Sequence, residues 1–121
     1  MQFMGICLVT DDVISLAEFY DAILMTSSER NDKHVEIQTE GAWLAIYSKD
    51  SAKDDMNLNF KKESGNFTLQ FIVEDIESEF QRLKKMGVEF INEPVTYPWG
   101  SRSMQFKDLE DNIVSFAQRN Q

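Results

Sequence analysis

The clearest pattern of hydrophobic and polar positions lies in residues 67–87. Over residues 67–73, hydrophobic Phe, Leu, Phe and Val alternate with Thr, Gln and Ile, which is the period of a β-strand with one buried face. Asp75 then offers a helix N-cap, and Gly87 is a residue type that ends helices. Between them the hydrophobic residues recur at helical spacing: Ile76, Phe80, Leu83 and Met86. The stretch therefore predicts a strand, a cap, an amphipathic helix and a stop.

The same pattern occurs once before, 63 positions earlier in the chain. Alternating residues over 3–10 predict a first strand, and Asp12 stands where Asp75 stands in the second copy. A helix is predicted over Val13–Leu24, with a buried stripe made by Val13, Leu16, Ala17, Tyr20 and Leu24. Repetition of a strand-helix unit in a short chain indicates a fold built by duplication.

Further alternating stretches complete two similar halves. They predict strands over 35–39 and 42–47 in the first half, and over 88–91, 101–107 and 113–117 in the second. A short strand is also considered over 27–31. Residues 49–65 are polar and charged, and we interpret them as a surface connection, in which Met56, Leu58 and Phe60 alternate as a short strand or a flap.

The predicted fold class is α+β, with two β-α-β-β-β modules forming a curved mixed sheet around a cleft and with the helices on the outside. We expect one domain over 1–121, with a first module at 1–48, a connection at 49–66 and a second module at 67–121.

The strand faces opposite the helices carry the candidate chemistry. If the two sheets curl together, these faces line a cleft, which by default is a small-molecule site. The residues on them are Gly5, Cys7, Val9, Trp43, Ala45, Tyr47, Thr68, Gln70, Ile72, Ile113, Ser115 and Ala117.

The net charge limits the classes of binding partner, and the cysteine content indicates the redox compartment. The net charge of −9 disfavours nucleic acid and anionic membranes and favours a cationic small molecule. The single cysteine, Cys7, excludes an internal disulfide and fits a reducing compartment. With no signal peptide and no apolar run long enough for a membrane span, we expect a cytoplasmic protein.

Three motifs, taken in order, make the chain resemble the glyoxalase, bleomycin-resistance and extradiol-dioxygenase superfamily, also called vicinal oxygen chelate proteins. They are residues 9–13 (VTDDV) followed by Phe19-Tyr20, residues 73–76 (VEDI) with Leu83 and Gly87-Val88, and residues 98–102 (PWGSR) followed by 106–112 (FKDLEDN). The resemblance covers nearly the whole chain. The sequence departs from the family pattern at Met25, Leu109 and Asp111, where glycine, proline and glycine are usual.

The resemblance implies four metal-ligand positions on equivalent strands, occupied in the enzymes by His, Gln or Glu. Here they correspond to Gly5, Ala45, Thr68 and Ser115. None of the four supplies an imidazole or a carboxylate, which divalent ions of this kind require. The one histidine, His34, is expected near a strand turn, well away from them. We therefore predict that the family metal site is absent and that no cofactor is bound.

Six residues are the candidate ligand contacts: Trp43, Tyr47, Gln70, Trp99, Arg102 and Ser115. The aromatic side chains can stack on a flat or cationic ligand, or can pack in the core or a dimer interface. Arg102 can pair with an anionic ligand group or with an acid of the protein. Gln70 can orient a ligand or be a solvated strand residue. No catalytic residue is assigned, and Cys7 is expected to be buried and inert.

Three functions are weighed. The first is a metal-free small-molecule-binding protein similar to the bleomycin-resistance branch, whose dimers sequester a drug between subunits. It would take an aromatic or cationic ligand. The alternative is a metal-dependent lyase, isomerase or dioxygenase, and the third is a duplicated scaffold without a ligand. Edge strands in each half need covering, so a homodimer is expected.

Overall fold

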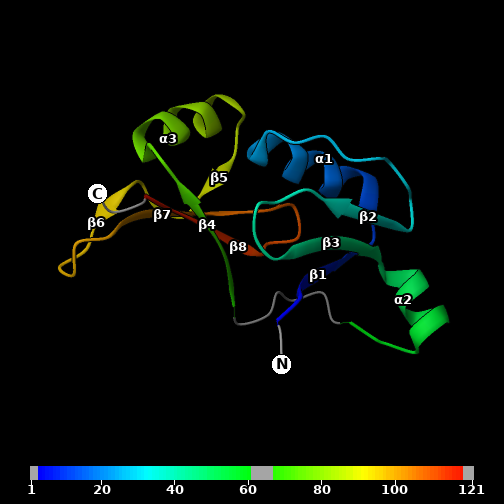
Figure 1. The fold of residues 1–121 in the computed structure, drawn as a ribbon. Coiled ribbons are helices and arrows are strands. Elements are labelled where there is room, and N and C mark those ends of the chain that lie inside the picture. The colour runs from blue at the N-terminus through cyan, green and yellow to red at the C-terminus, as the bar shows by residue number, and fades with distance from the viewer. Residues whose placement is uncertain (1–2, 61–66, 119–121) are drawn as a thin grey trace. The chain divides into compact units, whose positions relative to one another are not determined.

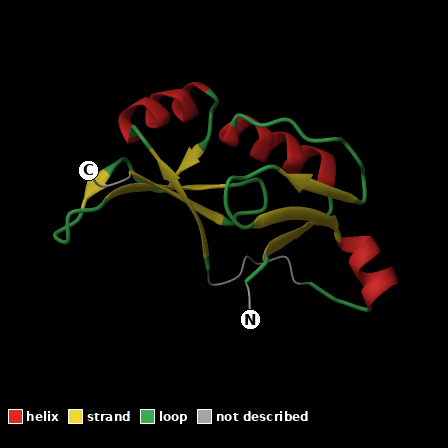
Figure 2. Ribbon diagram, in the orientation of Figure 1, coloured by secondary structure: helices red, strands yellow, loops and turns green. Residues whose placement is uncertain are grey.

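In the computed structural model, which describes residues 3–60 and 67–118, the chain forms two compact units (Figure 1). The first unit spans residues 1–62 and the second spans residues 63–121. Each unit has a sheet of mixed parallel and antiparallel strands, with a long helix against one face (Figure 2). The predicted α+β class is confirmed. Among the described residues, no helix combines the length and apolar content that crossing a bilayer requires.

The first unit contains β1 (Gly5–Thr10), α1 (Val13–Leu24), β2 (His34–Ile37) and β3 (Trp43–Ser48). The sheet order is β1-β3-β2, with β1 parallel and β2 antiparallel to β3. Helix α1 covers one face of this sheet, and the core lies between them (Figure 1). The hydrophobic residues of this core are Leu8, Val13, Leu16, Ala17, Tyr20, Ile23, Val35, Ile37, Leu44 and Ile46.

Helix α1 has the predicted bounds, and its start follows from Asp12. The Asp12 carboxylate accepts a hydrogen bond from the Ser15 backbone N–H at 3.1 Å, which satisfies a donor that the helix leaves unpaired. The buried stripe differs from the prediction at its end, because Ile23 and Asp21 are buried whereas Leu24 is only half-buried.

The segment after α1 is not the short strand considered for residues 27–31. Buried Asp21 holds it in an irregular conformation: its carboxylate accepts hydrogen bonds from Thr26, from the backbone and hydroxyl of Ser28, and from Arg30. Because the segment's polar groups are satisfied by this side chain, they form no ladder with a strand.

A helix stands where a surface connection was predicted. Helix α2 (Lys49–Met56) follows β3 directly, and the Ser48 side chain caps it by accepting from the Ser51 backbone N–H at 3.2 Å. Met56, Leu58 and Phe60 are exposed and form no strand in the described part of this segment. This helix was not predicted because α2 is polar, with only Ala52 buried, so its sequence shows little hydrophobic periodicity. Residues 61–66 of the predicted connection lie outside the described residues.

The second unit has a longer sheet, in the order β4-β8-β7-β5, with β6 also paired to β7. Strands β4 and β8 are parallel, and the other pairs are antiparallel. The elements are β4 (Thr68–Val73), α3 (Ile76–Lys85), β5 (Glu89–Phe90), β6 (Val95–Thr96), β7 (Arg102–Lys107) and β8 (Ile113–Gln118). The short strand β6 was not predicted, and β5 covers only part of the strand predicted at 88–91.

Helix α3 covers one face of this sheet, with the predicted signals at both ends (Figure 1). Asp75 caps it by accepting from the Ser78 backbone N–H at 3.3 Å. Gly87 takes a positive φ of 78° just beyond the helix, a conformation that glycine adopts at no steric cost. The hydrophobic residues of the core beneath it are Leu69, Ile76, Phe80, Leu83, Met104, Phe106, Val114 and Phe116.

Strand pairing repeats between the two units. Gly5 lies opposite Trp43 and Cys7 opposite Ala45 in the first. In the second, Thr68 lies opposite Ile113 and Gln70 opposite Ser115. The first strands are thus related by the 63-residue offset found in the sequence, and Ala45 corresponds to Ser115. The predicted duplication is present in the register of both sheets.

Candidate functional site

The sheet face opposite α1 carries the polar and aromatic residues of the first unit. Register fixes their rows: His34 lies opposite Tyr47, and Glu36 lies opposite Ala45, which in turn lies opposite Cys7. Trp43 follows in the next row. We call this surface the first open face and define it by His34, Glu36, Trp43, Tyr47 and Cys7.

Three rings lie close together on the first open face. The His34 ring centroid is 6.3 Å from that of Trp43 and 5.7 Å from that of Tyr47, the latter in an edge-on arrangement. Trp43 and Tyr47 are half-buried and lie on the face that the sequence predicted. His34 was expected near a strand turn and was not expected among these rings, whereas the structure places it beside Trp43 and Tyr47. Strand β2 begins at His34, one residue earlier than predicted, and pairs with β3.

Two titratable side chains of the first open face, Tyr47 and Cys7, have raised pKa values. The Tyr47 hydroxyl donates a hydrogen bond to the Asp55 carboxylate of α2 at 3.2 Å; desolvation and this bond raise the pKa of Tyr47. Cys7 is exposed, so the prediction of a buried cysteine was wrong. Strand β1 is an edge strand, so only one neighbouring strand flanks Cys7. Partial desolvation still raises the pKa of the Cys7 thiol, which makes it a poor nucleophile near neutral pH.

A hollow of about 320 Å³ lies at one end of the first open face. Glu36 and Trp43 line it together with Met4, Ile37, Gln38, Thr39 and Gly41. The Glu36 side chain is exposed, and its carboxylate has no hydrogen bond or ion pair within residues 3–60 and 67–118. Sequence reasoning placed Glu36 on an exposed strand face but did not select it. Its alternation with Val35 and Ile37 was the available signal.

The face opposite α3 carries hydrogen-bonding side chains of the second unit. Gln105 Nε2 donates to Ser115 Oγ at 2.9 Å, and Asn92 Nδ2 donates to Gln105 Oε1 at 2.6 Å. Asn92 Oδ1 in turn accepts from the Gln105 backbone N–H at 2.8 Å. We call this surface the second open face and define it by Gln70, Gln105 and Ser115.

Of the predicted contacts on the second open face, Gln70 is the more accessible. Gln70 is exposed, and its amide donates to Thr68 Oγ1 at 3.3 Å. Ser115 is 5% exposed and is engaged by Gln105. Sequence reasoning missed Gln105 and Asn92. The alternation of Gln105 with buried Met104 and Phe106 could have revealed the first, whereas Asn92 is in irregular structure without such a signal.

The two remaining predicted contacts lie elsewhere in the second unit. Arg102 has the same strand parity as Met104 and points toward α3, where its guanidinium pairs with Glu77 and donates to Thr96 Oγ1 at 2.9 Å. Of the two roles considered for Arg102, the structure shows the ion pair with an acid of the protein. Trp99 is 73% exposed in the turn between β6 and β7, stacked on Tyr97 with ring centroids 4.9 Å apart.

The residues at the family's metal positions do not fit a metal ion. A Cβ at residue 5 would lie 1.9 Å from the Trp43 carbonyl oxygen, so the backbone there leaves no room for any ligating side chain. Ala45 has no donor atom, and Thr68 and Ser115 supply only neutral hydroxyls. Within the described ranges, no three His, Cys, Asp or Glu side chains are grouped so as to hold an ion. The absence of a bound metal in the protein stays a prediction.

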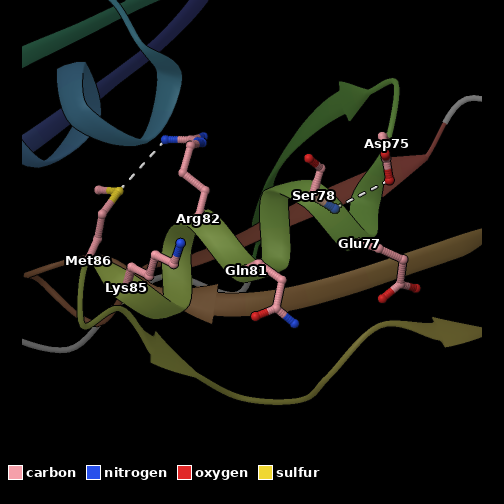
Figure 3. Close-up of a pocket in the computed structure, with 7 residues that line it drawn as sticks. All are labelled: Asp75, Glu77, Ser78, Gln81, Arg82, Lys85 and Met86. Carbon is pink, nitrogen blue, oxygen red and sulfur yellow. Dashed lines mark hydrogen bonds between the residues drawn. The ribbon is translucent and has the colours of Figure 1, made fainter.

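A second depression runs along α3, and several of its residues already have partners within the protein. Figure 3 shows Asp75, Ser78, Gln81, Arg82 and Met86 arranged along the helix rather than around an enclosed cavity. Asp75 caps the helix, and Arg82 contacts Met86 Sδ at 3.7 Å and pairs with Glu79 at 2.6 Å. This depression is therefore not the candidate site.

Comparisons with known proteins agree with this description. A sequence profile of the glyoxalase-like domain matches residues 3–119. The uncharacterized protein YetH of Bacillus subtilis is 33% identical over 81 residues, which are 65% of this chain and 61% of that protein. The chain thus spans less than two thirds of that relative's length.

Solved structures share the fold at low identity. A glyoxalase/bleomycin resistance protein/dioxygenase family enzyme from Burkholderia phytofirmans superposes with a TM-score of 0.84 at 15% identity, covering 98% of both chains. A protein of the same description from Nocardioides gives 0.81 at 21% identity, over 98% of this chain and 83% of that one. Lactoylglutathione lyase from Agrobacterium tumefaciens gives 0.76 at 15% identity, over 97% and 92%. Since the profile spans nearly the whole sequence, this chain belongs to the glyoxalase-like domain family of the vicinal oxygen chelate superfamily.

Proposed function

We propose that this protein is a metal-free binding protein for a small aromatic or cationic molecule, similar to the bleomycin-resistance members of its family. The proposed contacts in the first unit are Trp43 and Tyr47 on the first open face. The second unit, considered by itself, offers Gln70 and Ser115 on the second open face and the exposed indole of Trp99. The observation that carries the proposal is at Gly5, where the Trp43 carbonyl fills the space of a metal-ligand side chain while the Trp43 ring lies on the open face.

Two further observations support binding over catalysis. Ser115 is hydrogen-bonded to Gln105, whose amide does not titrate, so this pair supplies neither a general acid nor a general base. Cys7 is accessible but has a raised pKa, which disfavours the thiolate that a nucleophilic mechanism needs. The alternative, a metal-dependent lyase, isomerase or dioxygenase, requires a donor set that the four equivalent positions lack.

The test is equilibrium dialysis against a panel of aromatic cations and neutral aromatic compounds, with and without a chelator. We expect at least one compound to bind with a dissociation constant of about 10 µM or tighter, and the chelator to leave binding unchanged. Trp43→Ala should weaken binding about tenfold because stacking area is lost. Phe60→Ala removes an exposed aromatic ring outside the open face and serves as the matched control.

Two results would contradict the proposal. The first is no binding across the panel. The second is binding that disappears with chelation and returns with one equivalent of a divalent ion, because that would mean a metal centre has formed despite the residues at the four positions.

A further inference from the structure

We infer that the first open face recognises the positively charged part of the ligand, with Glu36 as its counter-ion and the rings of His34, Trp43 and Tyr47 as its wall. This inference rests on the proposed function and narrows it. It assigns a ligand charge and two residues, Glu36 and His34, that the sequence motifs do not single out.

Glu36 is an isolated charge on the sheet of the first unit. Strands β1, β2 and β3 contain no lysine or arginine, and Glu36 is their only carboxylate. Its side chain has no ion-pair or hydrogen-bond partner among the described residues, yet it lines a hollow with Trp43. An exposed acid is usually just solvated, but this one stands on a sheet face otherwise made of rings and small residues.

Aromatic rings lie in the rows on both sides of Glu36. Glu36 is in the middle row of the first open face, between the row of His34 and Tyr47 and the row of Trp43. Aromatic ring faces attract cations through their quadrupole, and a carboxylate attracts them through its charge. Both attractions therefore favour the same kind of group, a positively charged nitrogen in or beside a flat organic framework.

The second unit, as a copy of the first, has a position equivalent to Glu36. By register, Glu36 pairs with Ala45 as Gln105 pairs with Ser115, so Glu36 and Gln105 are equivalent positions in the two units. Gln105 is neutral and its amide is fully engaged by Ser115, Ser103 and Asn92. The second unit thus carries an amide with protein partners at this position, whereas the first carries an exposed charge with no protein partner among the described residues. The amide at the equivalent position shows that pairing of these strands does not require a charge, and the charge of Glu36 is assigned to ligand recognition.

The experiment compares two probes of nearly identical shape, the 1-methylquinolinium cation and neutral 1-methylnaphthalene. Binding is measured by dialysis and by the shift of the Trp43 indole N–H resonance, assigned with Trp43→Phe. We expect the cation to bind about tenfold tighter than the neutral probe. Glu36→Gln should weaken cation binding about tenfold and leave binding of 1-methylnaphthalene unchanged.

Control variants distinguish the effect of the Glu36 charge on binding from an effect on folding. Glu36 is exposed, so Glu36→Gln should keep the wild-type melting temperature, and Glu36→Lys should remove cation binding altogether. Glu40→Gln neutralises a nearby exposed acid in the following turn and should leave cation binding intact. Equal binding of both probes, unaffected by Glu36→Gln, would overturn this inference while the proposed function stands. If neither probe bound the wild-type chain and the Trp43 resonance did not shift, this inference would be overturned, and the dialysis panel would then decide the proposed function separately.

Discussion

Asp21 shows how one side chain organises a loop that has no secondary structure. It is 5% exposed, and burial by itself would raise its pKa. Hydrogen bonds from Ser28, Arg30 and Thr26 outweigh that effect and hold the pKa of the Asp21 carboxyl below its ordinary value of 3.8. Because the charged form is the one these donors stabilise, the chain leaves α1 along a fixed path.

The pKa of Asp21 predicts a pH-dependent contribution to stability. A carboxyl whose pKa is lowered on folding stabilises the protein above its unfolded pKa, and this contribution is lost as pH falls through the folded value. Asp21→Asn should therefore lower the free energy of unfolding by roughly 1 to 3 kcal/mol at pH 7. The ion pair with Arg30 contributes little of this, because the half-exposed guanidinium is screened by solvent.

Urea unfolding at several pH values would measure this effect. The difference between wild type and Asp21→Asn should shrink below pH 3.8, where the unfolded carboxyl binds a proton. Asp32→Asn, which changes an exposed acid in a turn, is the matched control and should be nearly neutral. A difference that stayed constant down to pH 2 would mean that the charge of Asp21 is not what holds the loop.

At the scale of elements, the pairing of β1 with β3 depends on a glycine. A Cβ at Gly5 would meet the Trp43 carbonyl oxygen at 1.9 Å and its carbon at 2.5 Å. This close approach also sets the neighbouring backbone, where the Trp43 N–H donates to the Met4 carbonyl at 2.8 Å. The two strands therefore approach most closely at residue 5, which corresponds to one of the family's four metal-ligand positions.

Gly5→Ala should destabilise the protein by about 2 to 3 kcal/mol, because the added carbon forces the backbone of one strand to shift. Gly41→Ala is the natural control, since a Cβ there would meet nothing within 4 Å, and its effect should stay within about 0.5 kcal/mol. Thermal unfolding followed by circular dichroism gives both values. Equal stability of the two variants would show that β1 accommodates a side chain at residue 5, and a ligand-bearing position would then be possible.

At the scale of the whole molecule, each unit leaves a strand edge open. Strand β1 ends one side of its sheet and β4 ends one side of the other. Exposed backbone edges are sites where other chains pair, and natural proteins usually cover them. Large apolar side chains are also exposed near both edges, among them Phe3, Met4 and Ile72.

These edges predict a homodimer. Sedimentation velocity at micromolar concentration should give a mass of twice the 14.0 kDa chain. Ile72→Lys places a charge on the edge strand β4 and is expected to shift the equilibrium toward monomer, whereas Leu109→Lys alters an exposed residue in a turn and should not. A wild-type chain that sediments as a monomer across this range would exclude the dimer.

Much of the fold followed from local pattern alone. Alternation and helical spacing determined α1, α3 and most strands, because in these elements one face is buried and the pattern is strong. The caps at Asp12 and Asp75 and the glycine at residue 87 were equally local. Helix α2 was missed because it buries little, so its sequence carries polar signals only.

Some features of the candidate site also follow from local sequence, whereas others depend on tertiary packing. The sequence by itself determined which strand faces are polar or aromatic and which side chains replace the family's ligands, because side-chain direction alternates along a strand. Only the tertiary structure decided which strands are neighbours. That pairing brought His34 and Glu36 beside Tyr47 and Trp43, turned Arg102 toward Glu77, and closed the space at Gly5. Such neighbours come from residues far apart in the chain, whose contacts depend on packing that no local pattern encodes.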